Sequence, residues 1–298
     1  GTSAPVSIGV ARVHTRLHWG RLGASPFGPV PSGYRVATGI AFAVIPRGLP
    51  GLELGFGRYF HLRWSDSVLT SANLTRPFIG LVRSTRITAS DPYGAEPDNQ
   101  LASIFARWVF PESGLEVYGE IGKDDYNSTT RDLLMEPDHI SAYVLGVQRV
   151  VRRADRGYLV LRGEVLNARI TSLNLNRPEV PLYVHSPVYE GHTHLGQVLG
   201  APGGNGGGSA EFAVDRYDSS GRTTVAWTRL LRHEYIDGNT GMRFPTRADL
   251  LEVLSLSGRR LCGRTAVTYE ATTVTELNRF FQGDAFNLRL SFGLARTW

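Results

Sequence analysis

Residues 285–298 read AFNLRLSFGLARTW, and this stretch decides the predicted fold. Apolar side chains recur at every second position, as in a β-strand with one apolar and one polar face. The apolar row suits lipid or a dry core, and the facing row suits a water-filled lumen. The stretch predicts the closing strand of a transmembrane β-barrel, with the edge strand of a sandwich as the alternative. The apolar row is Phe286, Leu288, Leu290, Phe292 and Leu294, and the facing row is Asn287, Arg289, Ser291, Gly293 and Ala295.

Composition is compatible with a barrel and excludes a helical membrane protein. The chain has 298 residues, 42% of them hydrophobic, and a mean hydropathy of −0.15. No stretch approaches the roughly 18 apolar residues that a membrane helix needs, whereas barrel strands need only about 9–11 residues, half of them polar. Because the chain starts at Gly1 without an initiator Met or a signal peptide, we expect its numbering to begin after processing or truncation.

Charge and cysteine content argue against some classes of binding partner and metal site. The net charge is +5, and Lys123 is the only lysine among the basic residues. The arginines are scattered rather than gathered into a stripe, so we expect no nucleic-acid partner. The single cysteine, Cys262, excludes an internal disulfide and most cysteine-based metal sites. The sequence predicts neither a bound metal nor a cofactor.

Long and short connections alternate along the chain. This order is typical of outer-membrane barrels, which have short periplasmic turns and long outer loops. The sequence therefore predicts an all-β, single-domain transmembrane antiparallel up-and-down β-barrel over residues 1–298. About twelve strands are visible, the C-terminus lies on the periplasmic side, and Trp298 lies in an aromatic girdle. The predicted strands are 6–14, 34–45, 52–62, 100–110, 115–122, 141–151, 158–168, 209–217, 222–233, 250–257, 261–271 and 285–298, and the long connections are 15–33, 63–99, 123–140, 169–208, 234–247 and 272–284.

The densest polar segment is Glu116–His139. Glu116, Tyr118 and Glu120 alternate on a predicted strand and would line the lumen. Carboxylates beside a histidine suit general acid–base chemistry, as in a hydrolase. The competing interpretation is a polar lumen whose charges pair across the barrel, and we predict no catalytic residue. The outer loop above the strand would hold Asp124, Asp125, Arg131, Asp132, Glu136, Asp138 and His139.

A second segment, 183–208, contains His185, Glu190, His192 and His194. His192 and His194 would point the same way on a strand, which is possible metal-ligand geometry. Hydrogen bonding is the competing interpretation. Tyrosines near polar residues favour carbohydrate, because sugar rings need flat apolar faces beside polar groups. The predicted ligand-binding residues are Tyr118, Glu120, Asp124, Asp125, Tyr126, Arg131, Tyr189, His192 and His194.

The run LEVYGEIGKDDYNSTTRDLLMEPDHISAYVLGVQRV, residues 115–150, resembles the capsule assembly Wzi family of outer-membrane proteins. The segments PVSIGVARVH and SPVYEGHTHLGQVLGAPGGNGGGSAEFAVDRY are similar to that family as well. The resemblance implies a barrel lectin that holds capsular polysaccharide at the surface of a Gram-negative bacterium. Family members have 18 strands and an N-terminal helical portion. We therefore expect either the C-terminal part of such a barrel, its N-terminal part missing, or a smaller relative. No single binding residue is carried over.

The expected function is non-enzymatic binding of surface or capsular polysaccharide in the bacterial outer membrane. Loop arginines would pair with acidic sugars, and tyrosine rings would stack on sugar rings. The expected partners are polysaccharide and outer-membrane lipid, and association with a larger envelope complex stays open. Two alternatives remain: an outer-membrane pore with charged rows, and an outer-membrane hydrolase built on Glu116–His139.

Overall fold

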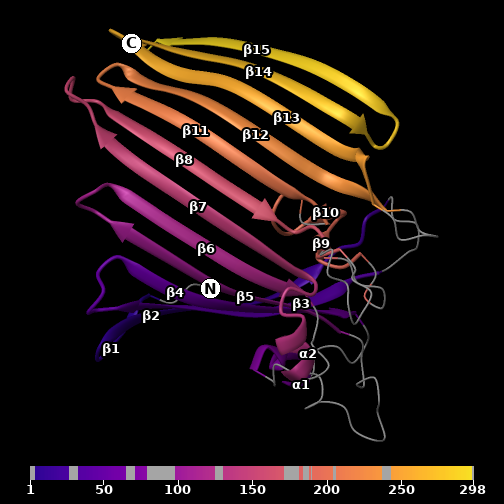
Figure 1. Cartoon of the computed structure of the whole chain (residues 1–298). Helices are drawn as coiled ribbons and strands as arrows, with labels where there is room; N and C mark the ends of the chain where they lie inside the picture. The colour runs from indigo at the N-terminus through magenta and orange to yellow at the C-terminus, as the bar shows by residue number, and fades with distance from the viewer. Residues whose placement is uncertain are drawn as a thin grey trace, which may run out of the picture. The chain divides into compact units, whose positions relative to one another are not determined.

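The computed structural model describes residues 4–26, 33–64, 71–78, 98–124, 130–170, 181–183, 188, 190–203, 206–236 and 243–296. Thirteen strands form one antiparallel up-and-down sheet, in which each strand pairs with the next along the sheet (Figure 1). The strand order ends at β1 and β15, and the sheet is not closed into a barrel. The sheet strands are β1 (Val6–Ile8), β2 (Ala11–Leu22), β3 (Arg35–Pro46), β4 (Leu52–Arg63), β5 (Asp98–Phe110), β6 (Leu115–Asp124), β7 (Ser141–Arg152), β8 (Tyr158–Asn167), β11 (Gly208–Asp218), β12 (Gly221–Ile236), β13 (Arg243–Cys262), β14 (Thr265–Arg279) and β15 (Gly283–Arg296).

The remaining elements are short. Strands β9 (Thr193–His194) and β10 (Gln197–Val198) form a separate two-stranded sheet. The helical pieces are α1 (Ser71–Leu74), η1 (Arg76–Phe78) and α2 (Thr130–Met135). Within the described residues, no helix has the length and hydropathy to cross a membrane. The all-β, antiparallel up-and-down prediction is confirmed, while barrel closure and membrane insertion remain predictions.

Strand register separates an apolar face from a polar face. Directly opposed residues share a face, because successive side chains alternate across the sheet. The row through Leu290 runs across six strands as Leu290, Ala271, Leu256, Val225, Val214 and Leu161. The next row is Ser291, Glu270, Ser257, Thr224, Asp215 and Val160. We call the side of the first row the apolar face and the side of the second row the polar face.

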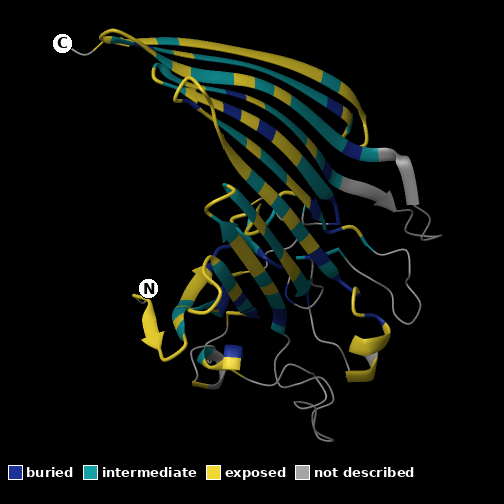
Figure 2. Ribbon diagram, turned by 60° about the vertical axis from the view of Figure 1, so that its left-hand side comes forward, coloured by how far each residue is buried: buried dark blue, intermediate teal, exposed yellow. Residues whose placement is uncertain are grey.

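The chain divides into two compact units. Unit 1 comprises residues 1–107, 120–143 and 168–205, and unit 2 comprises 108–119, 144–167 and 206–298. In unit 1, Val36, Phe60 and Leu62 form a buried cluster on the strands that η1 packs against. In unit 2, exposed residues dominate β15 (Figure 2).

Several predicted boundaries are wrong. Residues 6–14 are not one strand, because Gly9, at φ 45°, turns the chain between β1 and β2. Strand β2 continues to Leu22 and so occupies much of the predicted loop 15–33. The turn expected at 258–260 lies instead between β13 and β14, after Cys262. Polar arginines favoured a turn in the sequence, but Arg259 and Arg260 are paired with both neighbouring strands.

Two further expectations about connections need correction. The predicted long loop 272–284 is mostly strand, because β14 extends to Arg279. Only residues 280–282 join β14 to β15, so the long–short alternation fails at the last connection. Trp298, which we expect in an aromatic girdle, lies outside the described residues.

Candidate functional site

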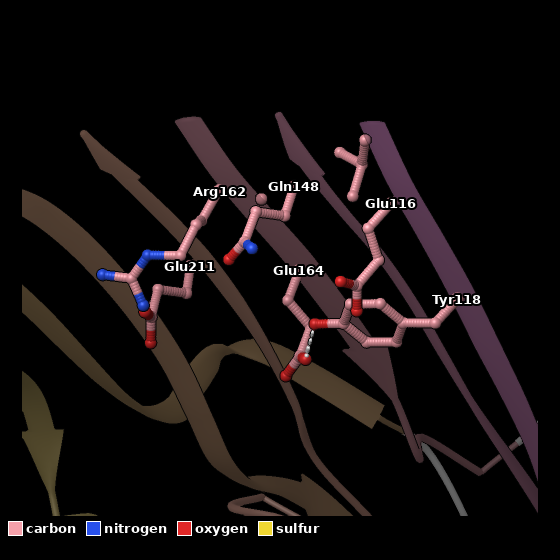
Figure 3. Close-up of a pocket in the computed structure, with 8 residues that line it drawn as sticks. Glu116, Tyr118, Gln148, Arg162, Glu164 and Glu211 are labelled. Carbon is pink, nitrogen blue, oxygen red and sulfur yellow. Dashed lines mark hydrogen bonds between the residues drawn. The ribbon is translucent and has the colours of Figure 1, made fainter. Parts of the chain in front are cut away.

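A hollow of about 340 Å³ lies on the polar face of unit 2. Strands β6, β7, β8 and β11 contribute its lining (Figure 3). Period-2 alternation brings the polar side chains of this lining to one side of the sheet, because each of them is flanked by neighbours that face the other way. We call it the polar pocket. Its lining residues are Glu116, Tyr118, Val147, Gln148, Arg162, Gly163, Glu164 and Glu211.

The Tyr118 side chain crosses over β7 because β7 has a glycine, Gly146, where the ring passes. A Cβ added to Gly146 would lie 2.0 Å from Tyr118 Cζ, so any larger residue would displace the ring. The tyrosine ring therefore spans β7 and reaches β8. There its hydroxyl donates a hydrogen bond of 2.5 Å to Glu164 Oε2 (Figure 3). This places a flat aromatic surface beside a carboxylate.

Arg162 is held at the pocket wall by Asp215, which is only 2% exposed. Arg162 Nε donates to Asp215 Oδ2 at 3.0 Å. Arg222 Nε and Thr224 Oγ1 donate to the other oxygen, Oδ1, at 2.9 and 2.6 Å. Asp215 thus accepts from two guanidinium groups and a hydroxyl. Charge-assisted bonds of this kind fix geometry, so Arg162 is preorganised.

The polar pocket offers hydrogen-bond acceptors, one guanidinium and one amide around an aromatic ring. Glu116, Glu164 and Glu211 accept hydrogen bonds from hydroxyl groups, whereas Arg162 and Gln148 donate. This donor and acceptor set, with a flat ring surface, suits a hydroxyl-rich ligand. Among the described residues, no group of three His, Cys, Asp or Glu side chains could hold a metal ion.

The acidic segment Glu116–His139 does not form one cluster. Glu116 and Tyr118 line the polar pocket, whereas Glu120 is not among its lining residues. Asp124 Oδ2 accepts the backbone N–H of Tyr183 at 2.8 Å. Glu136 and His139 pair with each other, with 3.8 Å between Oε2 and Nδ1. The carboxylates that the structure describes in this segment therefore make separate contacts rather than one cluster.

The histidine segment is a docked loop of unit 1. Glu190 accepts hydrogen bonds from Ser25 N at 2.9 Å and from Arg35 at 3.3 Å. His194 Nδ1 accepts the N–H of Gly23 at 3.0 Å, and His192 Nδ1 lies 2.8 Å from His61 Nε2. The three side chains contact four different residues, which agrees with the hydrogen-bonding interpretation for these positions. His185, the other histidine of the metal interpretation, lies outside the described residues. We call residues 190–200 the docked loop.

The remaining predicted site residues are dispersed or undescribed. Glu120 is exposed on β6, and Arg131 is exposed on α2. Asp125, Tyr126 and Tyr189 lie outside the described residues. Of the nine predicted ligand-binding residues, Tyr118 therefore lines the polar pocket.

Sequence reasoning left out several residues of the polar pocket. Gln148, Glu164 and Glu211 lie on three different strands, β7, β8 and β11, and strand pairing brings them together. Their alternating positions do identify them as polar-face residues. No sequence pattern marks Gly146 as a pocket residue, because its role depends on contact with Tyr118 of another strand.

Burial lowers the pKa of His192 to about 4. Its ring lies 4.6 Å from the His61 ring and 5.1 Å from those of Tyr59 and Tyr183, centroid to centroid. Arg35 opposes protonation as well. The unfolded loop binds a proton near pH 6.5, so docking is most stable above that pH and weakens as the pH falls to about 4. The loss is on the order of 3 kcal/mol.

We expect this loss to appear in amide hydrogen exchange of Leu195 and Leu199, whose N–H groups donate to Gly23 O and His192 O. After correction for intrinsic rates, protection falls between pH 7 and pH 4.5. His192→Gln keeps a hydrogen-bonding side chain and should flatten the dependence. An unchanged pH profile in this variant would contradict the role given to His192.

No protein-family model matches this chain, and no curated protein matches it in sequence. The fold and the polar pocket therefore define the class on their own. The chain is an all-β protein whose wide antiparallel meander sheet has one apolar and one polar face.

Proposed function

We propose that this chain forms an up-and-down β-barrel in a bacterial outer membrane and binds surface or capsular polysaccharide. The observation that carries the membrane assignment is the exposure of the apolar face. On β15, exposed fractions are 71% for Leu290 and 70% for Phe292. On other strands, Val225 is 47% and Leu254 is 54% exposed. Monomeric soluble proteins rarely expose contiguous apolar surface on this scale, whereas lipid covers it at no cost.

The height of the apolar row on β15 supports the same assignment. Charged residues Asp284 and Arg296 flank it on the same face. At 3.3 Å per residue they are about 40 Å apart along the strand. A strand tilt of about 40° reduces this to roughly 30 Å, close to the thickness of a hydrocarbon core.

Unpaired strand edges favour closure in the membrane. Hydrocarbon offers no partner for free backbone N–H and C=O groups, so open sheet edges do not occur in lipid. Strand β15 ends the strand order and pairs with β14 alone. The proposed membrane state therefore has both sheet edges paired, in a closed barrel.

The polar pocket supports carbohydrate binding inside such a barrel. Tyr118 offers a ring for stacking, and the surrounding carboxylates, amide and guanidinium match sugar hydroxyls. Similarity of residues 115–150 to the Wzi family supports capsular polysaccharide as the ligand class. In this proposal, residues on the strands bind the polysaccharide together with residues of the outer loops.

We expect Tyr118→Ala to weaken glycan binding about tenfold, by removing the stacking surface. Gly146→Ala should have a similar effect, because its Cβ displaces the Tyr118 ring. Tyr269→Ala is the matched control: Tyr269 also lies over a glycine, Gly258, but its register places it on the apolar face. Binding is measured by calorimetry on protein folded in detergent.

Three outcomes would count against this function. Equal losses in Tyr118→Ala and Tyr269→Ala would show that the polar pocket is not the binding site. Steady conductance in planar bilayers without glycan, combined with no glycan binding, would favour a pore. Cleavage of polysaccharide that is lost in Glu164→Gln would show an enzyme.

A further inference from the structure

We infer that a second hollow, on one face of the strands of unit 1, is a subsite for the anionic group of a sugar ring. The hollow has a volume of about 200 Å³ and lies over β2, β3 and β5. This inference rests on the proposed polysaccharide binding and adds the charge class of the ligand. We call it the basic subsite. Its lining residues are His14, Thr15, Arg16, Ala41, Phe42, Ala43 and Phe105.

The charge of the basic subsite is positive. His14 and Arg16 are two residues apart on β2, so both side chains project from the same face of the strand, about 7 Å apart along it. Among the described residues, no carboxylate pairs with Arg16. By contrast, Arg35, Arg107 and Arg162 each pair with a carboxylate of unit 1 or unit 2.

A guanidinium that is paired with no carboxylate of the described residues is suited to an external one. Its planar fork matches a carboxylate or phosphate through two parallel hydrogen bonds. His14 adds a second polar group to the same face. The two residues provide both charge and directed donors for one anionic substituent.

The floor of the basic subsite is flat and apolar. Arg16 is paired with Ala41 and His14 with Ala43, so small side chains lie directly beside the two polar groups. Ala43 is in turn paired with Gly55. A Cβ on Gly55 would lie 2.0 Å from Phe105 Cζ, so the Phe105 ring packs directly on the glycine backbone.

This combination fits a ring that carries one anion. The C–H face of a sugar packs against the Phe105 ring and the alanine methyl groups, as aromatic sites for flat ligands do. The anionic substituent then reaches Arg16 and His14. A uronic acid or a phosphorylated sugar has this chemistry, whereas a neutral hexose lacks the anion.

The test compares three probes by calorimetry: an oligosaccharide of glucuronic acid, the matched glucose oligosaccharide, and inorganic phosphate. We expect the glucuronic oligosaccharide to bind at least tenfold tighter than the glucose oligosaccharide. Arg16→Gln should remove that preference. Ala41→Leu, which fills the hollow and keeps the arginine, should also reduce it.

The matched control is Arg289→Gln. Arg289 is a polar-face arginine of unit 2, is 73% exposed at its side chain and lies 3.9 Å from Glu270. Its substitution should leave the preference intact. Heat-modifiable migration on gels confirms that each variant is folded.

Four outcomes would overturn the basic subsite. These are equal affinity for both oligosaccharides, a preference that survives Arg16→Gln, a preference that survives Ala41→Leu, and inorganic phosphate binding as tightly as the glucuronic oligosaccharide. Loss of binding for every glycan in the unaltered protein would instead overturn the proposed function itself. Glucose binding that falls in Tyr118→Ala while no acidic preference exists would overturn the basic subsite alone.

Discussion

Leu290→Arg is expected to destabilise the folded protein in lipid by about 2–4 kcal/mol. Leu290 lies near the middle of β15 on the apolar face and is 71% exposed. In a bilayer, an arginine there must be desolvated or must thin the membrane around it. In water the same substitution would cost less than about 0.5 kcal/mol, because the side chain is already exposed.

Ser291→Arg is the matched control for Leu290→Arg. Ser291 is the next residue, at the same depth, but it lies on the polar face opposite Glu270. An arginine there would face that carboxylate, so stability should change by less than about 0.5 kcal/mol. Urea unfolding in lipid vesicles measures both. Equal effects of the two substitutions would contradict a membrane location for the apolar face.

Replacing Arg35 by leucine is expected to release the docked loop and to cost about 3–5 kcal/mol. The Arg35 side chain is 1% exposed and pairs with Glu190 at 3.3 Å. Its guanidinium also donates to the backbone oxygens of Gly191, Gly23 and Thr193 at 2.9–3.0 Å. Leucine leaves these buried acceptors and the Glu190 charge without their donor, which is the costly case for a buried pair.

Glu190→Ala should produce a similar loss, and the double variant should lose less than the sum, because both residues serve one contact. Proteolysis within residues 190–200 and the free energy of unfolding measure the release. Arg289→Leu is the control, because its exposed pair with Glu270 at 3.9 Å contributes less than about 1 kcal/mol. A protease-resistant loop in both single variants would mean that other contacts hold it.

Residues of the docked loop illustrate the limit of sequence reasoning. His192 and His194 were recognisable as a polar pair at strand spacing, which left metal binding and hydrogen bonding open. The structure separates them, since His192 meets His61 and His194 meets Gly23. Neither partner is close in sequence, so no local pattern could select between the two interpretations.

Predicted strand boundaries were wrong where the local composition favours a turn but the residues pair with neighbouring strands. The run from Gly258 to Arg260 has the glycine and arginines of a turn, yet each residue pairs with β12 and β14. Gly258 leaves room for the Tyr269 ring, since an added Cβ would lie 2.3 Å from the tyrosine oxygen. A cross-strand contact therefore explains a glycine that the sequence assigned to a turn.

The sequence by itself determined the antiparallel strands and the two chemically different faces. These follow from side-chain alternation, which is a property of the extended backbone and is visible in stretches such as residues 285–296. Only the tertiary structure decided which polar residues meet. Tyr118 and Glu164 touch because β7 separates them by a single glycine, and Arg35 binds Glu190 across 155 residues of chain. Register and loop docking depend on the whole sheet, so no short stretch encodes them.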